Sequence, residues 1–286
     1  MDNLKAKKRH PEEIAVYSAI YVCAAFSVLL LLGIIVYVFA KGARRVNWAF
    51  LTGITSILHG TVGIAGNILN TLIIILLTMI ITTPIGVGAA IYLNEYAKPG
   101  KLGTVIIFAT ETLAGIPSII FGLFGMLFFG QLCHMGYSLL TGSLTLTLMV
   151  LPLVTRNTQE ALKTVPDSFR TGAVGLGAGK WYTIRTILLP SAMPGIVTGV
   201  ILAIGRIIGE SAALLFTAGS AHLLPKTFDA FLEKIFHSGG TLTIQLYLSA
   251  SKGEFEVAFG IAVVLLVIVL LINFGTKRLA KKLEKH

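Results

Sequence analysis

Two charged residues interrupt an otherwise apolar stretch of this sequence. Arg206 and Glu210 lie within the run GVILAIGRIIGESAALLF at 199–216. A charged side chain at the centre of a bilayer costs roughly 2.5–3.5 kcal/mol, so it needs a partner or a function there. On a helix, residues four apart share a face, which puts the two charges about one turn apart. The spacing predicts either a transient anion site or a permanent Arg–Glu pair that fixes helix packing.

Arginine is well suited to hold an oxyanion. Its planar guanidinium matches two oxygens at once and stays charged at any accessible pH. With Arg206 as the donor, Glu210 would hold the guanidinium when no anion is bound and keep the site from binding too tightly. Arg156 follows another apolar segment and is either an exit-side contact for the anion or a positive anchor at the membrane surface. Glu111, early in a third apolar segment, is expected at the interface.

The composition is that of a membrane protein. The chain has 286 residues, of which 55% are hydrophobic and 13% charged, and its mean hydropathy is +0.85. Soluble domains have about 25% charged residues. Because no polar stretch is long enough to fold separately, we expect one all-α, polytopic transmembrane domain over 14–275.

Six segments are long and apolar enough to cross a bilayer, which takes about 20 helical residues. They cover approximately 14–40, 64–93, 104–130, 137–155, 193–218 and 256–275. Lys and Arg are concentrated in the N-terminal segment 1–13, the connections at 93–104 and 156–192, and the basic tail at 276–286. Since basic residues favour the cytoplasmic side, both termini and 156–192 are expected in the cytoplasm, and 219–255 outside.

Several classes of function are disfavoured by the sequence. This topology accounts for the net charge of +10, so nucleic-acid binding is not expected. The six histidines lack metal-ligand spacing, and no nucleophile–base pair is evident, so we expect neither a metal site nor an enzyme. The run GLGAGK at 175–180 is not a phosphate-binding loop, because Val174 replaces a required glycine and Trp181 a required Ser or Thr.

Amphipathic stretches occur in two of the connections. In 156–192, apolar residues recur at helical spacing: Phe169, Ala173, Val174 and Leu176, then Trp181, Ile184, Ile187 and Leu188. Asp167 and Ser168 are candidate N-caps for the first helix, and Pro190 is expected to end the second. These helices would dock into a groove of another protein or lie on lipid. The external run KTFDAFLEKIF at 226–236 offers the same two interpretations.

The cytoplasmic segment resembles the loop of bacterial ABC importer permeases. That loop reads Glu-Ala-Ala, three residues, Gly, nine residues, Ile-x-Leu-Pro, and here Thr171-Gly172-Ala173 replaces Glu-Ala-Ala. In that family the segment is the coupling helix, which fits a groove on the ATP-hydrolysing subunit. The resemblance implies these ATPase-docking residues: Ser168, Phe169, Arg170, Thr171, Gly172, Ala173, Gly177, Ile187, Leu189 and Pro190.

Longer stretches resemble one branch of these permeases, the A-type (PstA) subunits of phosphate ABC importers. They are PIGVGAAIYLNEYA at 84–97, ETLAGIPSIIFGLFG at 111–125, LPLVTRNTQEALKTVPDSFR at 151–170 and LPSAMPGIVTGVILAIGRIIGESAALLFTAG at 189–219. The resemblance implies a type I, MetI-like fold with six transmembrane helices and phosphate import by alternating access. It also implies transport roles for Arg156, Arg206 and Glu210.

The same resemblance implies several partners in the cytoplasmic (inner) membrane of a prokaryote. They are a homologous permease subunit (PstC type), two ATP-binding subunits (PstB type), an extracytoplasmic phosphate-binding protein (PstS type) and the surrounding lipid. The chain itself would bind no cofactor, because the ATP-binding subunits would use the ATP. Two alternatives remain open: a permease for another oxyanion, such as sulfate or molybdate, and a proton-coupled secondary transporter with Glu210 as relay.

Overall fold

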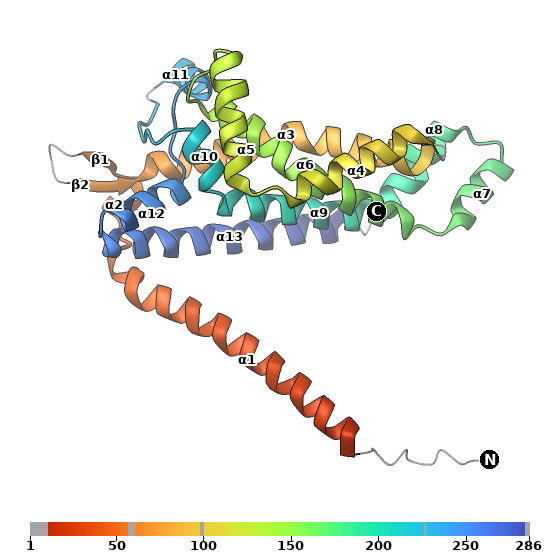
Figure 1. The fold of residues 1–286 in the computed structure, drawn as a ribbon, viewed down its shortest axis with the longest axis horizontal. Coiled ribbons are helices and arrows are strands. Elements are labelled where there is room, and N and C mark those ends of the chain that lie inside the picture. The colour runs from red at the N-terminus through yellow and green to blue at the C-terminus, as the bar shows by residue number, and fades with distance from the viewer. Residues whose placement is uncertain (1–10, 57–60, 98–99, 226, 284–286) are drawn as a thin grey trace.

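Long helices dominate the computed structural model, which describes residues 11–56, 61–97, 100–225 and 227–283 (Figure 1). The longest are α1 (Pro11–Gly42), α3 (Ala65–Ile91), α6 (Leu139–Lys163), α9 (Leu189–Gly209) and α13 (Phe255–Leu283). The basic N-terminal residues, which were predicted to be cytoplasmic, lie outside the described residues, and so does the end of the basic tail. Within the described part, five helices are long and apolar enough to cross a membrane, or six if one bent pair counts as a span. This agrees with the six predicted spans.

The bent pair is the third predicted span. Helix α4 (Lys101–Gly115) meets α5 (Ser118–Gly125) at 105°, and α5 continues into a π-helical turn, Met126–Leu132. Pro117 stands at the break with ψ of 139°. Proline has no N–H to donate and disfavours a helical conformation at the preceding residue, so the chain turns there. This bend leaves α4 alongside α6.

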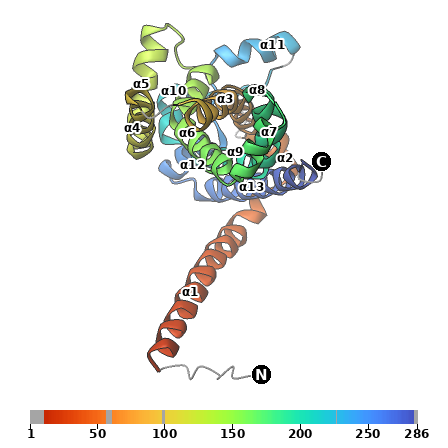
Figure 2. The same ribbon diagram turned by 90° about the vertical axis from the view of Figure 1, so that its right-hand side faces the viewer.

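The core forms where α3, α6 and α9 pack side by side, with α13 along their flank (Figure 2). Ile74, Leu146, Ile207, Leu214 and Ile261 are among the largest fully buried side chains. Glycines bring α9 and α6 close together. A Cβ added at Gly195 would lie 2.5 Å from Cβ of Ala161, and one at Gly199 would lie 2.6 Å from Cβ of Asn157.

Short elements gather at one end of the bundle and the helices of 156–192 at the other (Figure 1). The first group contains α2 (Trp48–Thr52), the antiparallel strands β1 (Ile54–Ser56) and β2 (Thr61–Ile64), α10 (Ala212–Thr217), α11 (Phe228–Glu233) and α12 (Leu242–Ser251). Side-chain caps start α11 and α12, where Thr227 and Thr241 accept hydrogen bonds from Ala230 and Ile244 N–H groups. The second group contains α7 (Asp167–Gly175) and α8 (Lys180–Thr183).

The amphipathic run that was predicted to be external forms α11 followed by a 3-10 turn, Lys234–Phe236. Phe231 and Ile235 pack against the core, while Leu232 and Phe236 remain exposed. The Lys234 ammonium is buried beneath this turn and donates to the carbonyl of Leu223. Burial lowers the pKa of Lys234 below its ordinary value, because the charged form loses water.

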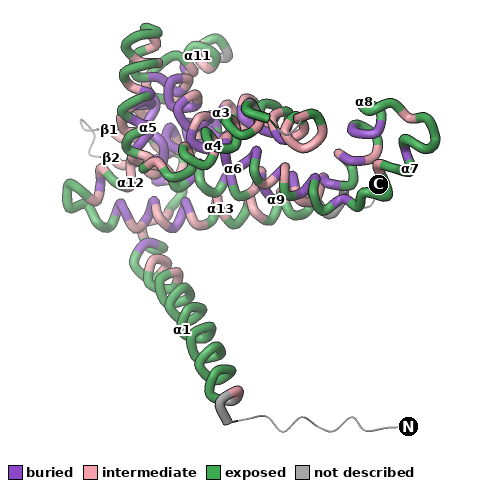
Figure 3. The backbone as a smooth tube through the Cα atoms, turned by 45° about the vertical axis from the view of Figure 1, so that its right-hand side comes forward, coloured by how far each residue is buried: buried purple, intermediate pink, exposed green. Residues whose placement is uncertain are grey.

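Helix α1 stands apart from the bundle and projects away from it (Figures 1 and 2). The Tyr37 and Phe259 rings meet edge to face at 5.7 Å, near the point where α1 reaches α13. Side chains along the remainder of α1 are mostly exposed (Figure 3). An apolar helix of this length needs lipid or another protein around it.

Candidate functional site

The two arginines predicted to contact an anion line the same cavity. It has a volume of about 360 Å³ and lies between α4, α6 and α9. Arg156 enters from α6 and Arg206 from α9, while Thr110 and Glu111 contribute from α4. Gln159 lies one turn beyond Arg156 on α6. The cavity therefore combines two cationic forks with polar groups that hydrogen-bond oxygen atoms.

Helical periodicity explains why both arginines face this cavity. On α6, Val150, Val154 and Leu162 are buried on one side, while Arg156 is exposed on another. On α9, Ala203 and Ile207 are among the buried residues, whereas Arg206 is exposed. Burying the apolar face of each helix leaves the guanidinium on the opposite face.

Both guanidinium groups are available to a ligand. Within the described part of the chain, neither Arg156 nor Arg206 has a hydrogen bond or ion pair to another residue. Each guanidinium has five N–H donors, which are costly to leave unsatisfied away from water. This face therefore needs water, an anion or another polypeptide against it.

Glu210 does not share the helix face of Arg206, which corrects the prediction made from their spacing. Helix α9 ends at Gly209, and Glu210 is extended, with φ of −83° and ψ of 120°. Its carboxylate accepts a hydrogen bond of 3.0 Å from Ala213 N–H, and its carbonyl accepts one of 2.9 Å from Thr243 Oγ1. Glycine is a weak helix former, and these two bonds, one local and one to α12, stabilise a break after it. Glu210 instead helps to start α10.

Glu111, which was expected at the membrane interface, is one of two carboxylates in the described part of the chain that line the cavity. Glu160 also lines the cavity, but it is paired with Lys163 at 3.1 Å. Within the described residues, Glu111 has no ion pair to another side chain. The sequence signal for Glu111 is a carboxylate inside an apolar segment that a proline then bends.

The segment 156–192, predicted to be cytoplasmic and called the cytoplasmic segment below, forms two short helices, as predicted, with an apolar outer face. Exposed side chains there are Phe169, Val174, Leu176, Trp181 and Tyr182. Leu176 is 90% exposed, more than the other four side chains of this group. Gly177 follows with φ of +81°, a left-handed conformation that favours glycine and closes α7.

The opposite side of this segment is anchored to the membrane helices. Ile184 and Leu188 are buried against Leu162 and Val165 at the end of α6. Among the predicted docking residues, Ala173 is buried, and Ile187 and Leu189 are half-buried. The others, apart from Arg170, are exposed: Ser168, Phe169, Thr171, Gly172, Gly177 and Pro190.

Two predicted helix boundaries in this segment are wrong. Pro166 is the N-cap of α7 and makes no side-chain cap bond, while Asp167 opens the helix and pairs with Arg170. Pro190 does not end a helix. It lies in the first turn of α9, where its missing N–H costs little, and a π-helical turn, Ile184–Leu188, joins α8 to α9.

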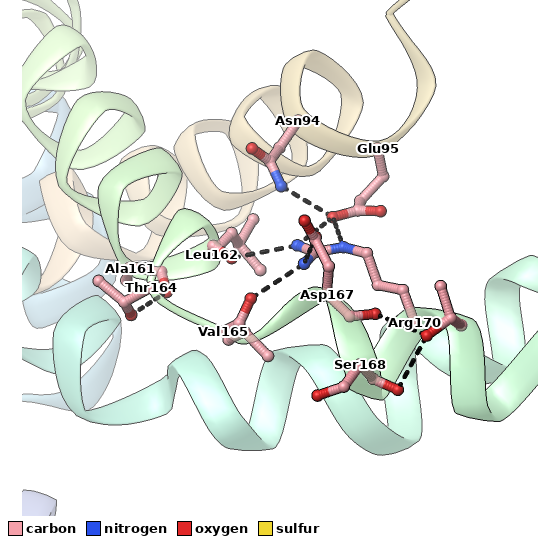
Figure 4. Close-up of polar contacts among 10 residues, drawn as sticks. Asn94, Glu95, Ala161, Leu162, Thr164, Val165, Asp167, Ser168 and Arg170 are labelled. Carbon is pink, nitrogen blue, oxygen red and sulfur yellow. Dashed lines mark hydrogen bonds and ion pairs between the residues drawn. The ribbon is translucent and has the colours of Figure 1, made fainter.

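Arg170 points inward to the ends of α3 and α6 (Figure 4). Its Nε and Nη2 donate to Glu95 Oε1 at 3.3 and 3.0 Å. Nη2 also donates to the Leu162 carbonyl at 3.1 Å, and Nη1 donates to the Val165 carbonyl and Asp167 Oδ1, both at 3.0 Å. Arg170 is therefore a structural link inside the chain.

A known protein family matches the part of the chain that contains the cavity residues and the cytoplasmic segment. A family model described as "binding-protein-dependent transport system inner membrane component" matches residues 82–286. The match spans the cavity residues and the cytoplasmic segment. The chain belongs to this family.

Curated relatives of this ABC importer permease include phosphate transport proteins. The probable ABC transporter permease protein YqgI of Bacillus subtilis is 35% identical over 273 residues, which cover 92% of this chain and 93% of that protein. The phosphate transport system permease protein PstA of Xylella fastidiosa is 34% identical over 84% of this chain and 82% of its own length. PstA 1 of Mycobacterium tuberculosis is 34% identical over 79% of this chain and 70% of its own length.

Solved structures give the permease fold. A bacterial alginate ABC transporter aligns with a TM-score of 0.71 over 96% of both chains, at 14% identity. The MetNI methionine ABC transporter in an inward-facing conformation aligns with a TM-score of 0.59 over 77% of this chain and 94% of that chain, at 22% identity. The chain is thus a multi-pass membrane permease with a MetI-like fold.

Proposed function

We propose that this chain is the permease subunit of an ATP-driven phosphate importer in the cytoplasmic membrane of a prokaryote. The observation that supports this most is the cavity to which Arg156 and Arg206 contribute from different helices. Phosphate at neutral pH is a mono- or dianion with several acceptor oxygens. Two guanidinium forks complement its charge and its oxygens. The PstA names of the relatives are consistent with that substrate.

Transport by this subunit is proposed to require partners on three sides. A homologous permease subunit of PstC type would supply the other half of the pathway, because the arginines are exposed in the single chain. Two ATP-binding subunits of PstB type would provide hydrolysis, and a phosphate-binding protein of PstS type would deliver the anion outside. Closure of the ATP-binding subunits would then alternate the pathway between outward-open and inward-open states.

The exposed apolar face of α7 and α8 is the proposed docking surface for an ATP-binding subunit. Leu176→Asp places a charge on this surface without disturbing the fold, because the side chain is 90% exposed. We expect the variant to insert normally but to lose most of the ATPase that co-purifies with the wild-type chain. Thr186→Asp is the control, because Thr186 is exposed but lies in the π-helical turn that follows α8. Equal ATPase recovery with both variants would contradict the docking surface.

Uptake in proteoliposomes tests the function directly. The chain is reconstituted with its co-purifying subunits and an external phosphate-binding protein, with ATP inside and radiolabelled phosphate, sulfate or molybdate outside. We expect ATP-dependent accumulation of phosphate in preference to the other two anions. Preferential uptake of sulfate or molybdate would show that phosphate is not the substrate. Uptake that survives without ATP but stops when the proton gradient is removed would contradict ATP-driven transport and favour proton-coupled transport.

A further inference from the structure

Every N–H donor group of the Arg170 guanidinium has a partner within the chain. Nε, Nη1 and Nη2 together contact Glu95, Asp167 and the carbonyls of Leu162 and Val165 (Figure 4). These partners come from three elements: the end of α3, the end of α6 and the start of α7. An arginine saturated in this way fixes the relative positions of the three elements.

The bond to Glu95 is the protected part of this network. The Glu95 side chain is 9% exposed and that of Arg170 is 24% exposed, whereas Asp167 is 92% exposed. Asn94 Nδ2 also donates to Glu95 Oε1 at 2.8 Å, which holds the carboxylate in place. Removing one member of a shielded ion pair is strongly destabilising, while a pair open to water contributes little. Glu95 is therefore the strong contact and Asp167 the weak one.

A second cation reaches the same turn of α3. Lys180, at the start of α8, places Nζ 4.5 Å from the centroid of the Tyr96 ring. Glu95 and Tyr96 belong to a π-helical turn, Tyr92–Tyr96, that ends α3. Both helices of the cytoplasmic segment are thus attached to one turn of a membrane helix. π-Helical turns are wider than α-helical ones and occur frequently at functional sites.

From this turn, α3 leads to the anion cavity through close packing with α6. A Cβ added at Gly86 would lie 2.9 Å from Val154 Cγ1 and 3.5 Å from the backbone nitrogen of Thr155. Arg156 is the next residue. Tightly packed helices transmit displacement because they cannot be compressed.

We propose that the Arg170–Glu95 ion pair is a positioning pair that passes movement of the cytoplasmic segment to α3, and through α6 to Arg156. The inference rests on the proposed function, in which ATP-binding subunits move this segment. With the pair intact, α7 and the cytoplasmic end of α3 move as one body. Without it, α7 moves with the ATPase while α3 lags behind.

The test uses the complete reconstituted transporter carrying Glu95→Gln, which keeps the shape of the side chain and removes its charge. We expect assembly and ATP hydrolysis to persist, while anion transported per ATP falls by about tenfold or more. Asp167→Asn is the matched control, because it removes the exposed partner of the same arginine, and it leaves the ratio unchanged. A parallel loss of hydrolysis and transport, or an unchanged ratio in Glu95→Gln, would overturn the proposal.

A second readout does not depend on which anion is transported. Spin labels on cysteines introduced at Gly175 of α7 and Ile85 of α3, in a chain whose exposed Cys23 and Cys133 are replaced by serine, report the distance between the two helices. When Glu95 is intact, we expect ATP binding to leave this distance unchanged. When the labelled transporter also carries Glu95→Gln, we expect ATP binding to alter it. A distance that responds equally in both refutes the positioning pair. Failure of the wild-type complex to accumulate phosphate refutes instead the proposed substrate.

Discussion

Arg156 and Arg206 reach one cavity from separate helices, so their separation depends on how α6 and α9 pack. A cavity built in this way changes shape whenever the helices shift. Under the proposed function, anion affinity is then linked to conformation, as alternating access requires.

Neutralising either arginine tests, at the level of single residues, whether the cavity binds the transported anion. We expect Arg206→Gln and Arg156→Gln each to reduce phosphate uptake by about tenfold or more, since each removes a charged donor to the anion. Lysine keeps the charge but loses the fork, so Arg206→Lys is expected to retain partial uptake. Arg44→Gln, at an exposed arginine far from the cavity, is the control. Full uptake by Arg206→Gln in proteoliposomes would exclude the cavity from the pathway.

Glu111 gives a second prediction at this scale. Glu111 lines the cavity and has no ion pair among the described residues, so under the proposed function we expect it to compete with the anion for the guanidinium groups. Glu111→Gln is expected to lower both the KM for phosphate and kcat by about threefold or more, because the anion binds more tightly and leaves more slowly. Glu160→Gln is the control, since Glu160 is exposed and paired with Lys163. A higher KM in Glu111→Gln would contradict this role.

Much of the site could be predicted from residue types, but the pairing of charges could not. Charges within or beside apolar runs single out Arg206 and Arg156, and the structure brings both to one cavity. The break after Gly209 depends on contacts with α12, through the bond from Thr243 to the Glu210 carbonyl. Likewise, Glu111 reaches the cavity because Pro117 turns α4 back beside α6. Such long-range contacts have no signature in local spacing.

At the scale of elements, glycine positions decide how closely α9 approaches α6. Gly195→Ala would place a methyl group 2.5 Å from Ala161 Cβ, so the helices must separate. We expect the free energy of unfolding to fall by about 1–3 kcal/mol. At Gly205 an added Cβ meets nothing within 4 Å, so Gly205→Ala is the control and should be neutral or slightly stabilising. Equal melting temperatures of the two variants in detergent would contradict the close packing.

The external turn at Lys234 predicts a pH dependence. Burial lowers the pKa of Lys234 from 10.5, so the unfolded chain keeps a proton over a range in which the folded chain is losing it. Stability contributed by this residue therefore rises as pH increases toward 10.5 and is lost as pH falls through the folded-state value. We expect Lys234→Met to flatten the alkaline slope of melting temperature against pH. Lys252→Met, at an exposed lysine, should keep the wild-type slope; the same flattening there would contradict the assignment.

Elements were more predictable than their ends. The six apolar segments and the two short cytoplasmic helices follow from hydropathy and periodicity alone. Pro190 was expected to stop a helix, but a π-helical turn carries the chain past it into α9. Arg170 was expected on the docking surface, but a buried carboxylate on a distant helix draws it inward. Both outcomes depend on neighbours that are far away in the sequence.

At the scale of the whole molecule, the exposed surfaces of the single chain correspond to three different environments. The cavity face presents arginines, the cytoplasmic face presents aromatic and aliphatic side chains, and α1 presents an apolar helix. Charged, amphipathic and lipid-like surfaces require different partners. The fold is therefore that of one component within a larger assembly.

The isolated position of α1 has a consequence for biogenesis. The apolar stretch of α1 that could cross a membrane has none of its residues buried against the rest of the chain. The packing of the other helices therefore gains little from α1 beyond its contact with α13, and we expect most of its length to face lipid or a second polypeptide. We expect a copy made without a second subunit to leave this helix open to membrane proteases, and therefore to be degraded faster than a copy in the assembled transporter.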